Sequence, residues 1–229
     1  MKELKFHGRS IITGRGSLSI VKDLGVKRVF LVTGGRSMFD NGVVRKIEGF
    51  LKETGAEVHV QSGIPANPPL SVVEQGVAAM NTFSPDAVIG LGGGSAMDTA
   101  KLMALFYEYP ELDIETAFKT GLPQKRQKTT LICIPGTSGT ASEVTPFAVL
   151  TFTADNIKIG AKSVALVPDL AILDPEITLS MPAHVAAETG IDALTHAIEC
   201  FTNKSVDDFT GCLAAGAVEN LFAFLPSSV

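Results

Sequence analysis

The sequence predicts an α/β protein in which a Rossmann-like parallel sheet is followed by the start of an all-helical domain. Short apolar runs alternate with helical patterns through most of the chain, which is typical of a parallel sheet with helices on both faces. Glycines and small polar residues follow several of these runs. After Leu179 the pattern changes to two long helices with no strand between them. We therefore place a boundary near 177–180, with one domain over 1–178 and a second over 179–229.

The composition narrows the classes of partner. The chain has 229 residues, is 45% hydrophobic and carries a formal net charge of −5, which argues against nucleic acid or an anionic membrane as the main partner. Its three cysteines form no C-x-x-C pair, as expected in a reducing cytoplasm. The most apolar run, 163–173, is broken by Pro168 and Asp169, so we expect no membrane span.

The expected elements follow from apolar periodicity and turn residues. We expect strands at 6–13 (an edge strand), 29–33, 56–61, 87–91, 129–134 and 171–173, with a hairpin formed by 144–152 and 157–167. Helices are expected up to Gly25, at 43–54 and 71–81, after Ser95, and at 182–201 and 207–224. The polar stretch 112–128 is expected to be an irregular surface excursion.

The strand at 87–91 leads into Gly92-Gly93-Gly94-Ser95 and then a helix. Ser95 is a good N-cap residue, and Asp98 three residues later completes a capping-box pattern. Glycines let a phosphate approach the backbone, while the free N–H groups and the helix dipole attract it. The match to G-x-G-x-x-G fails at Ser95, and a tight turn without a ligand is the alternative.

The strand at 29–33 ends in Gly34-Gly35-Arg36-Ser37, with no acid until Asp40. In dinucleotide-binding folds, an acid at this place bonds the adenine ribose 2′-hydroxyl. Small residues here leave room for a 2′-phosphate, which Arg36 and Ser37 could contact. A plain turn is the alternative.

A second loop of small residues runs over 135–143 and contains Thr137, Ser138 and Thr140. Its hydroxyls and glycines suit a nicotinamide ribose or a phosphate, although an ordinary loop is the alternative. Lys162, in the expected hairpin, is either a ribose contact or a solvated surface residue.

Asp192 and His196 stand at i and i+4 on one expected helix face, where a carboxylate and an imidazole can bind one divalent ion. Glu199 lies three residues further on. An ordinary helix pair or a core histidine is the alternative. His184 lies about 12 Å along the helix axis from Asp192, and the remaining histidines, His7 and His59, belong to the sheet domain. The chain thus offers two ligands where a site normally needs three or more.

Taken together, these segments resemble the iron-containing (group III) alcohol dehydrogenase family. The segments that carry the resemblance occur in the family's order: Gly92 to Ser95 with Asp98 and Lys101, 135–143, Pro168-Asp169 through Asp174-Pro175, and 190–199. The resemblance implies a dehydroquinate-synthase-like fold, with a nucleotide-binding domain over 1–178 and the first helices of a metal-binding domain over 179–229.

The resemblance also implies roles for individual residues. Asp192 and His196 match the first two ligands of the catalytic metal, Fe²⁺ or Zn²⁺, through which they are the catalytic residues. The family completes that site with two histidines from later helices, so we expect this chain to be a truncated form. Glycine at position 34 resembles the members that prefer NADP over NAD. The predicted cofactor-binding set is Gly34, Gly35, Arg36, Ser37, Gly92, Gly93, Gly94, Ser95, Asp98, Thr137, Ser138, Thr140 and Lys162.

The implied activity is reversible hydride transfer between a primary alcohol or aldehyde and NAD(P), with NADP favoured. The metal would act as a Lewis acid on the substrate oxygen. Two alternatives stay open: a glycerol- or polyol-dehydrogenase-like enzyme or a cyclising synthase of the same fold, and an inactive nucleotide-binding fragment. We expect a cytoplasmic homo-oligomer, a dimer, acting on a small molecule.

Overall fold

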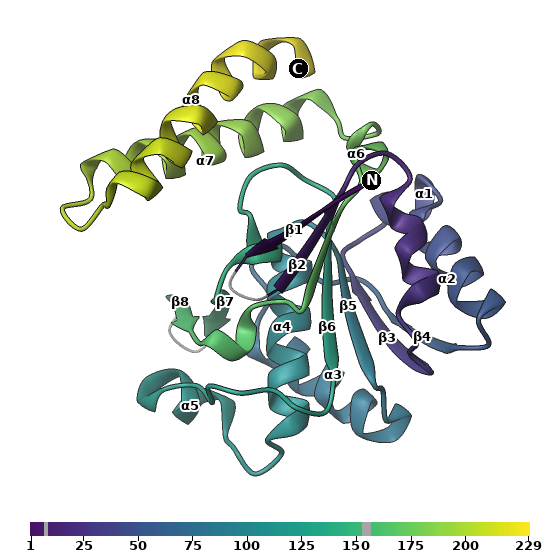
Figure 1. Cartoon of the computed structure of the whole chain (residues 1–229). Helices are drawn as coiled ribbons and strands as arrows, with labels where there is room; N and C mark the ends of the chain where they lie inside the picture. Colours follow the sequence, from purple (N-terminus) through teal and green to yellow (C-terminus); the bar gives the residue numbers. More distant parts are fainter. Residues whose placement is uncertain (7–8, 153–156) are drawn as a thin grey trace. The chain divides into compact units, whose positions relative to one another are not determined.

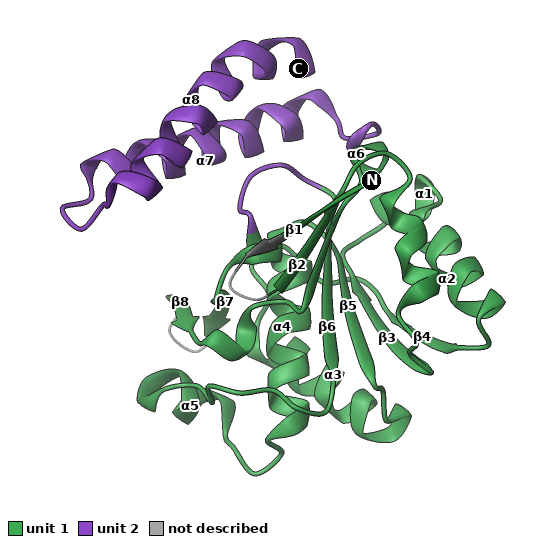
Figure 2. Cartoon of the chain, in the orientation of Figure 1, with its two compact units in different colours: residues 1–136, 142–177 green, residues 137–141, 178–229 purple. Residues whose placement is uncertain are grey.

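The computed structural model describes residues 1–6, 9–152 and 157–229. The chain divides into two compact units (Figure 2). The first, here called the sheet unit, comprises 1–136 and 142–177, and the second, the helical unit, comprises 137–141 and 178–229.

A seven-stranded sheet forms the centre of the sheet unit (Figure 1). Its strand order is β1-β2-β9-β6-β5-β3-β4, and every neighbouring pair except β1–β2 is parallel. The strands are β1 (Lys2–Phe6), β2 (Arg9–Thr13), β3 (Arg28–Thr33), β4 (Glu57–Gln61), β5 (Ala87–Gly92), β6 (Thr130–Pro135) and β9 (Leu170–Leu173). As predicted, β7 (Phe147–Phe152) and β8 (Ile157–Lys162) pair as a separate antiparallel hairpin.

The prediction of one edge strand over 6–13 was wrong. β1 is the edge, and β2 lies inside the sheet between β1 and β9. Lys2 and Glu3 are exposed on β1, and such charges are common on exposed edges because they discourage pairing with other chains.

Helices cover both faces of the sheet. One buried cluster joins α3 (Leu70–Phe83) and α4 (Gly94–Glu108) to the sheet, and the other joins the 3₁₀ helix η1 (Ser17–Asp23) and α2 (Val43–Glu53) to it. The remaining short elements of this unit are α1 (Ser37–Asp40), α5 (Ile114–Thr120), η2 (Ser142–Val144) and η3 (Val164–Leu166). α5 corrects the expectation of an irregular stretch at 112–128: the Asp113 carboxylate caps it by accepting from the Thr116 N–H at 2.8 Å.

The helical unit contains the two predicted helices without a strand between them, α7 (Ala183–Thr202) and α8 (Asp208–Ser228), and these pack against each other. The short helix α6 (Pro175–Thr178) ends where this unit begins. Gly190 permits close packing, since a Cβ atom there would lie 2.3 Å from the Leu225 Cδ1 atom. Asp207 caps α8 by accepting from the Thr210 N–H at 2.7 Å.

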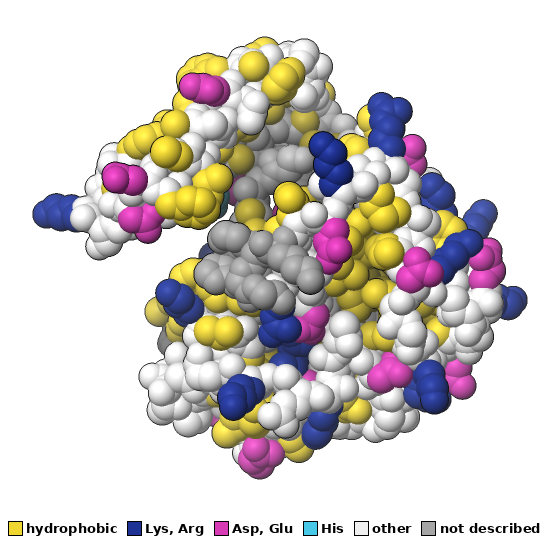
Figure 3. Space-filling model, viewed as in Figure 1, with side chains coloured by type: hydrophobic (Ala, Val, Ile, Leu, Met, Phe, Trp, Pro, Cys, Tyr) yellow, Lys and Arg dark blue, Asp and Glu magenta, His cyan; other side chains and the backbone are white. Residues whose placement is uncertain are grey.

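The outer faces of α7 and α8 carry many exposed apolar side chains, which gather on the visible face in Figure 3. Phe209 is 65% exposed and Phe222 is 69% exposed. By length and composition alone, α8 is the one helix among the described residues that could cross a membrane, whereas the sequence analysis expected no such segment. That criterion is weak by itself, because core helices of soluble proteins also meet it.

Candidate functional site

Three of the segments predicted to bind a cofactor follow neighbouring parallel strands. Gly34 follows β3, Gly92 ends β5 and is followed by Gly93 and Gly94, and Gly136 follows β6. The strand register aligns Thr33 with Leu91 and Gly92 with Pro135. The three segments therefore lie side by side at the carboxyl edge of the sheet.

This edge is also the point where the strand order reverses. From β3 the chain continues to β4 on one side and then returns to β5 on the other. In open α/β sheets, ligands bind outside the carboxyl ends of the strands at such a switch point. The topology thus places the cradle glycines where this class of fold binds nucleotides.

The cradle is formed by the backbone at the start of α4. Gly92 is buried and has a φ of +127°, a conformation that favours glycine. Gly93 is the N-cap, with no side-chain hydrogen bond, and its carbonyl accepts from the Ala96 N–H at 3.1 Å. The N–H groups of Gly94 and Ser95 precede these first bonds of the helix and have no acceptor within it, so they are available to an anion.

A second glycine brings the end of β6 against the cradle. The Gly136 N–H donates to the Gly92 carbonyl at 2.8 Å. A Cβ atom at Gly136 would lie 3.2 Å from the Gly92 Cα atom and 2.9 Å from the Met38 Cε atom. Only a residue without a side chain fits this approach without displacing its neighbours.

The predicted capping box at Ser95 and Asp98 was wrong. The N-cap is Gly93, two residues before Ser95, and the Ser95 hydroxyl instead accepts a long 3.4 Å bond from the Asn67 N–H. Asp98 points to another part of the sheet unit: its carboxylate accepts from the Ser142 hydroxyl and, at 3.1 Å, from the Val149 N–H. Because Gly93 already serves as the N-cap, the Asp98 side chain is free for these distant partners.

Lys101 is the polar residue that sequence reasoning left without a role. Its side chain is fully buried, and its ammonium donates to the Thr145 carbonyl at 3.1 Å, the Thr145 hydroxyl at 3.2 Å and the Phe147 carbonyl at 2.9 Å. Burial lowers the pKa of Lys101, although nearby acidic groups, Asp98 among them, act in the opposite direction. The signal available in the sequence was a lysine on an otherwise apolar helix, three residues after an aspartate.

The segment after β3 is open to solvent. Arg36 has an 89% exposed side chain and pairs with Asp40 at 3.5 Å. Gly35 and Ser37 are exposed as well. A Cβ atom at Gly34 would meet only the Ile64 carbonyl oxygen, at an ordinary 3.8 Å, so the glycine is not required there by packing.

The loop residues Thr137, Ser138 and Thr140 belong to the helical unit. Within that unit, Ser138 helps to line an apolar groove beside Gly190 and Leu225. Lys162 lies on β8 in the sheet unit, where it is exposed and its ammonium is 5.4 Å from the centre of the Phe147 ring.

Asp192 and His196 face each other on α7. The Asp192 Oδ1 atom lies 3.7 Å from the His196 Nε2 atom, and Glu199 lies 4.0 Å from the other ring nitrogen. The His196 side chain is 59% exposed. Within the described ranges, no group of three or more His, Cys, Asp or Glu side chains could hold a metal ion.

Among the histidines that the structure describes, no other joins Asp192 and His196 in a metal-binding group. His59 is stacked on Phe30, with ring centres 4.8 Å apart. His7 lies outside the described residues. The two donors on α7 therefore do not by themselves fit a bound Fe²⁺ or Zn²⁺ ion.

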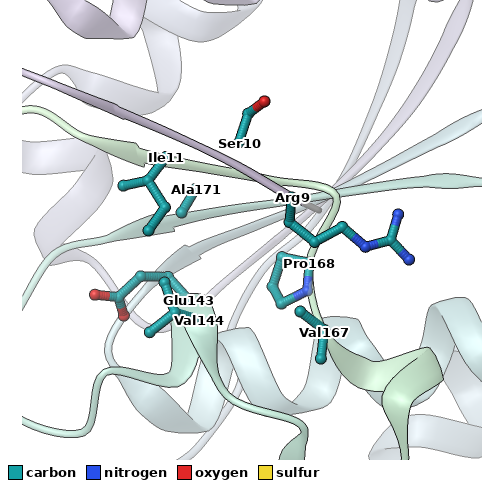
Figure 4. Close-up of a pocket in the computed structure, with 8 residues that line it drawn as sticks. All are labelled: Arg9, Ser10, Ile11, Glu143, Val144, Val167, Pro168 and Ala171. Carbon is teal, nitrogen blue, oxygen red and sulfur yellow. The ribbon is translucent and has the colours of Figure 1, made fainter. Parts of the chain in front are cut away.

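A small pocket in the sheet unit holds one more acidic group (Figure 4). Glu143 lies beside Val144, while the Arg9 guanidinium points away from it and pairs with Asp169. Burial raises the pKa of Glu143, with a backbone hydrogen bond and Lys101 acting in the opposite direction.

Comparisons with known proteins point to one family. The family model for iron-containing alcohol dehydrogenases matches residues 8–175. An NADPH-dependent butanol dehydrogenase from Clostridium saccharobutylicum is 43% identical over 214 residues, which are 92% of this chain and 55% of that protein.

Solved structures are similar over nearly the whole chain. The iron-containing alcohol dehydrogenase from Thermococcus thioreducens superimposes with a TM-score of 0.88 at 35% identity, covering 98% of this chain and 61% of that one. An NADH-dependent butanol dehydrogenase A from Thermotoga maritima gives a TM-score of 0.87 at 29% identity, covering 99% and 58%. The chain thus spans little more than half the length of these proteins.

Proposed function

The chain belongs to the iron-containing alcohol dehydrogenase family, and from this premise we propose that it binds NADP(H) at the carboxyl ends of β3, β5 and β6. The observation that carries the proposal is the cradle at Gly92, Gly93 and Gly94, because a positive φ and a glycine-to-glycine contact there leave the backbone open to a phosphate. The pyrophosphate would lie at the N-terminus of α4, near Ser95.

The remaining predicted residues have separate roles in this proposal. The open segment at Gly34, Gly35, Arg36 and Ser37 would receive the adenine ribose and its 2′-phosphate, to which a guanidinium can donate two hydrogen bonds. The hydroxyls of Thr137, Ser138 and Thr140 and the Lys162 ammonium would contact the nicotinamide side. The name of the Clostridium relative includes NADPH and that of the Thermotoga relative NADH, so family membership alone does not predict the preferred cofactor. We assign the preference for NADP to the segment from Gly34 to Ser37.

For the whole protein we propose reversible hydride transfer between a primary alcohol and its aldehyde. The nicotinamide ring accepts or supplies the hydride. In this reaction the chain would bind the cofactor phosphates and hold the nicotinamide ring against a small alcohol. A polyol substrate is the alternative within the same fold.

We propose Asp192 and His196 as two of the ligands of a metal ion. An Fe²⁺ or Zn²⁺ ion needs further donors than these two, and the described residues supply no third one. The two-donor arrangement favours a second candidate function for the 229-residue chain, cofactor binding without turnover.

We further propose a cytoplasmic location and a homodimeric state. Three free cysteines, Cys133, Cys200 and Cys212, are consistent with a reducing compartment. The exposed apolar side chains of α7 and α8 are available for burial in an assembly.

Calorimetric titration of the 229-residue chain tests the cofactor proposal. NADPH should bind with one site per chain and more tightly than NADH. Absence of heat or saturation with both cofactors would refute it, and equal affinities would refute the preference for NADP.

A further inference from the structure

The loop over 137–141 leaves the sheet unit and returns to it at two fixed points. At its start, Gly136 is held to the cradle by the 2.8 Å bond from its N–H to the Gly92 carbonyl. At its end, the Ser142 hydroxyl donates to the Asp98 carboxylate, and Ser142 is only 3% exposed. One fixed point is therefore the cradle itself, and the other is a side chain on the helix that begins at the cradle.

The second fixed point is reinforced over the following residues. Asp98 also accepts from the Val149 N–H, and the three donors of Lys101 hold Thr145 and Phe147. The Asp98 Oδ1 and Lys101 Nζ atoms are 3.7 Å apart. Asp98 and Lys101 thus tie 142–149 to α4, at positions four and seven residues after Gly94.

A fully buried ammonium is costly unless its donors are all paired. Apolar residues of similar size would hold the hairpin on α4 without that cost, but they would not fix the backbone carbonyls at one place. Directional bonds to two carbonyls and a hydroxyl set the position of the segment more narrowly than apolar packing does.

We propose that Asp98 and Lys101 are positioning residues for the cofactor, which set the loop with Thr137, Ser138 and Thr140 by holding its returning end at Ser142. This inference rests on the proposed cofactor site and specifies how Asp98 serves it: through Ser142. Ordering a loop before binding lowers the entropy that the cofactor must overcome, which raises affinity without adding a contact.

The test is a double-mutant cycle on Asp98→Ala and Ser142→Ala, read by NADPH titration. Each single variant should weaken NADPH binding about tenfold, because the cofactor would then have to order the side chains of the loop on binding. In the Asp98→Ala background, Ser142→Ala should add less than about twofold, because the two residues act through one bond. Ser19→Ala is the control, since it also removes one serine hydroxyl and its hydrogen bond, in this case to the Gly16 carbonyl at 2.8 Å.

Amide hydrogen exchange without cofactor supplies a second readout. Asp98→Ala and Lys101→Met should both speed exchange over 142–149 and leave 94–97 unchanged. Lys101→Met should also weaken NADPH about tenfold, although a side chain that is fully buried cannot contact the cofactor. If one variant does not fold, the other and Ser142→Ala still decide the matter.

Three outcomes would overturn the inference. Independent, multiplying losses from Asp98→Ala and Ser142→Ala would mean that Asp98 contacts the cofactor directly. Faster exchange with unchanged NADPH affinity would mean that the pair serves stability only. Unchanged exchange would mean that it does not hold the segment. A wild-type chain that binds no NADPH refutes the proposed function instead, and the cofactor part of this inference falls with it, while the exchange data still show whether the pair holds 142–149.

Discussion

The sheet unit and the helical unit differ in how their functional residues are supported. Every residue of β5, which leads into the cradle, is buried. The Gly136 N–H donates to the Gly92 carbonyl at the end of this strand, and Lys101, on the following helix, donates to the Phe147 carbonyl. On α8, by contrast, Ala214 is the only buried residue, and the donor pair on α7 is about half exposed. The proposed cofactor site therefore depends on contacts within the chain, whereas the proposed metal site depends on donors that the described residues do not provide.

The largest expected effect is the loss of cofactor binding when the cradle in the sheet unit is blocked. Gly93→Val places a branched side chain at the N-cap of α4, where the phosphates must approach the backbone, and should weaken NADPH binding by more than about 100-fold while the chain stays folded. Gly49→Val is the control, because a Cβ atom there meets nothing within 4 Å on α2. Normal NADPH affinity in a folded Gly93→Val chain would place the phosphates elsewhere.

The second prediction concerns the two metal donors of the helical unit. After dialysis against Fe²⁺ or Zn²⁺, the 229-residue chain should retain far less than one ion and show negligible alcohol oxidation, because Asp192 and His196 are only two donors. A chain extended to the length of its relatives should hold one ion per subunit, and His196→Ala in it should abolish metal binding and turnover but spare NADPH binding. Stoichiometric metal with full turnover in the 229-residue chain would contradict this prediction.

The third prediction concerns cofactor preference, which we assign to the exposed segment that follows β3 in the sheet unit. Arg36→Ala should weaken NADPH about tenfold and leave NADH unchanged, since a charge-assisted bond to the 2′-phosphate is lost. Gly34→Asp, for which there is room, should favour NADH by repelling that phosphate. Asp40→Asn is the matched control: it frees Arg36 from its ion pair and should strengthen NADPH binding slightly. The three affinities can be measured by calorimetry, and equal losses for both cofactors would exclude a role in discrimination.

The smallest expected effect concerns pH. Because burial raises the pKa of Glu143 above its ordinary 4.5, the folded chain binds this proton more tightly than the unfolded chain does. Its contribution to the free energy of unfolding is therefore most favourable below pH 4.5 and declines as the pH rises through the raised pKa. Glu143→Gln should remove this decline, which urea unfolding at pH 5 and 8 would measure. An unchanged pH slope would show that Glu143 ionises alike in both states.

Local patterns in the sequence predicted most of the fold. Apolar runs located β3, β5 and β6, and glycines located the cradle, because both signals depend on a few consecutive residues. The resemblance to one family rested on motifs read in order, and the family model confirmed it.

The helix α5 was missed although its cap, from Asp113 to Thr116, is local. The other three errors share one cause: a partner distant in the chain decided the outcome. Ser95 and Asp98 satisfy the local rule for a capping box, but Asp98 is engaged by Ser142, 44 residues away. The pairing of β2 with β9 likewise joins residues that no local window contains. The role of Lys101 was missed for the same reason, since its acceptors lie on another element.

The pairing of β2 with β9 has a consequence for how the protein is made. Arg9 and its partner Asp169 are separated by 160 residues, so at 5–20 residues per second the ribosome needs about 8–32 s between synthesising one and the other. Throughout that time β2 has no parallel neighbour and only the short β1 to pair with. A nascent chain therefore exposes one strand edge until residue 173 has emerged, and a chaperone that shields the first 13 residues should raise the yield of native protein more than one that binds the chain later.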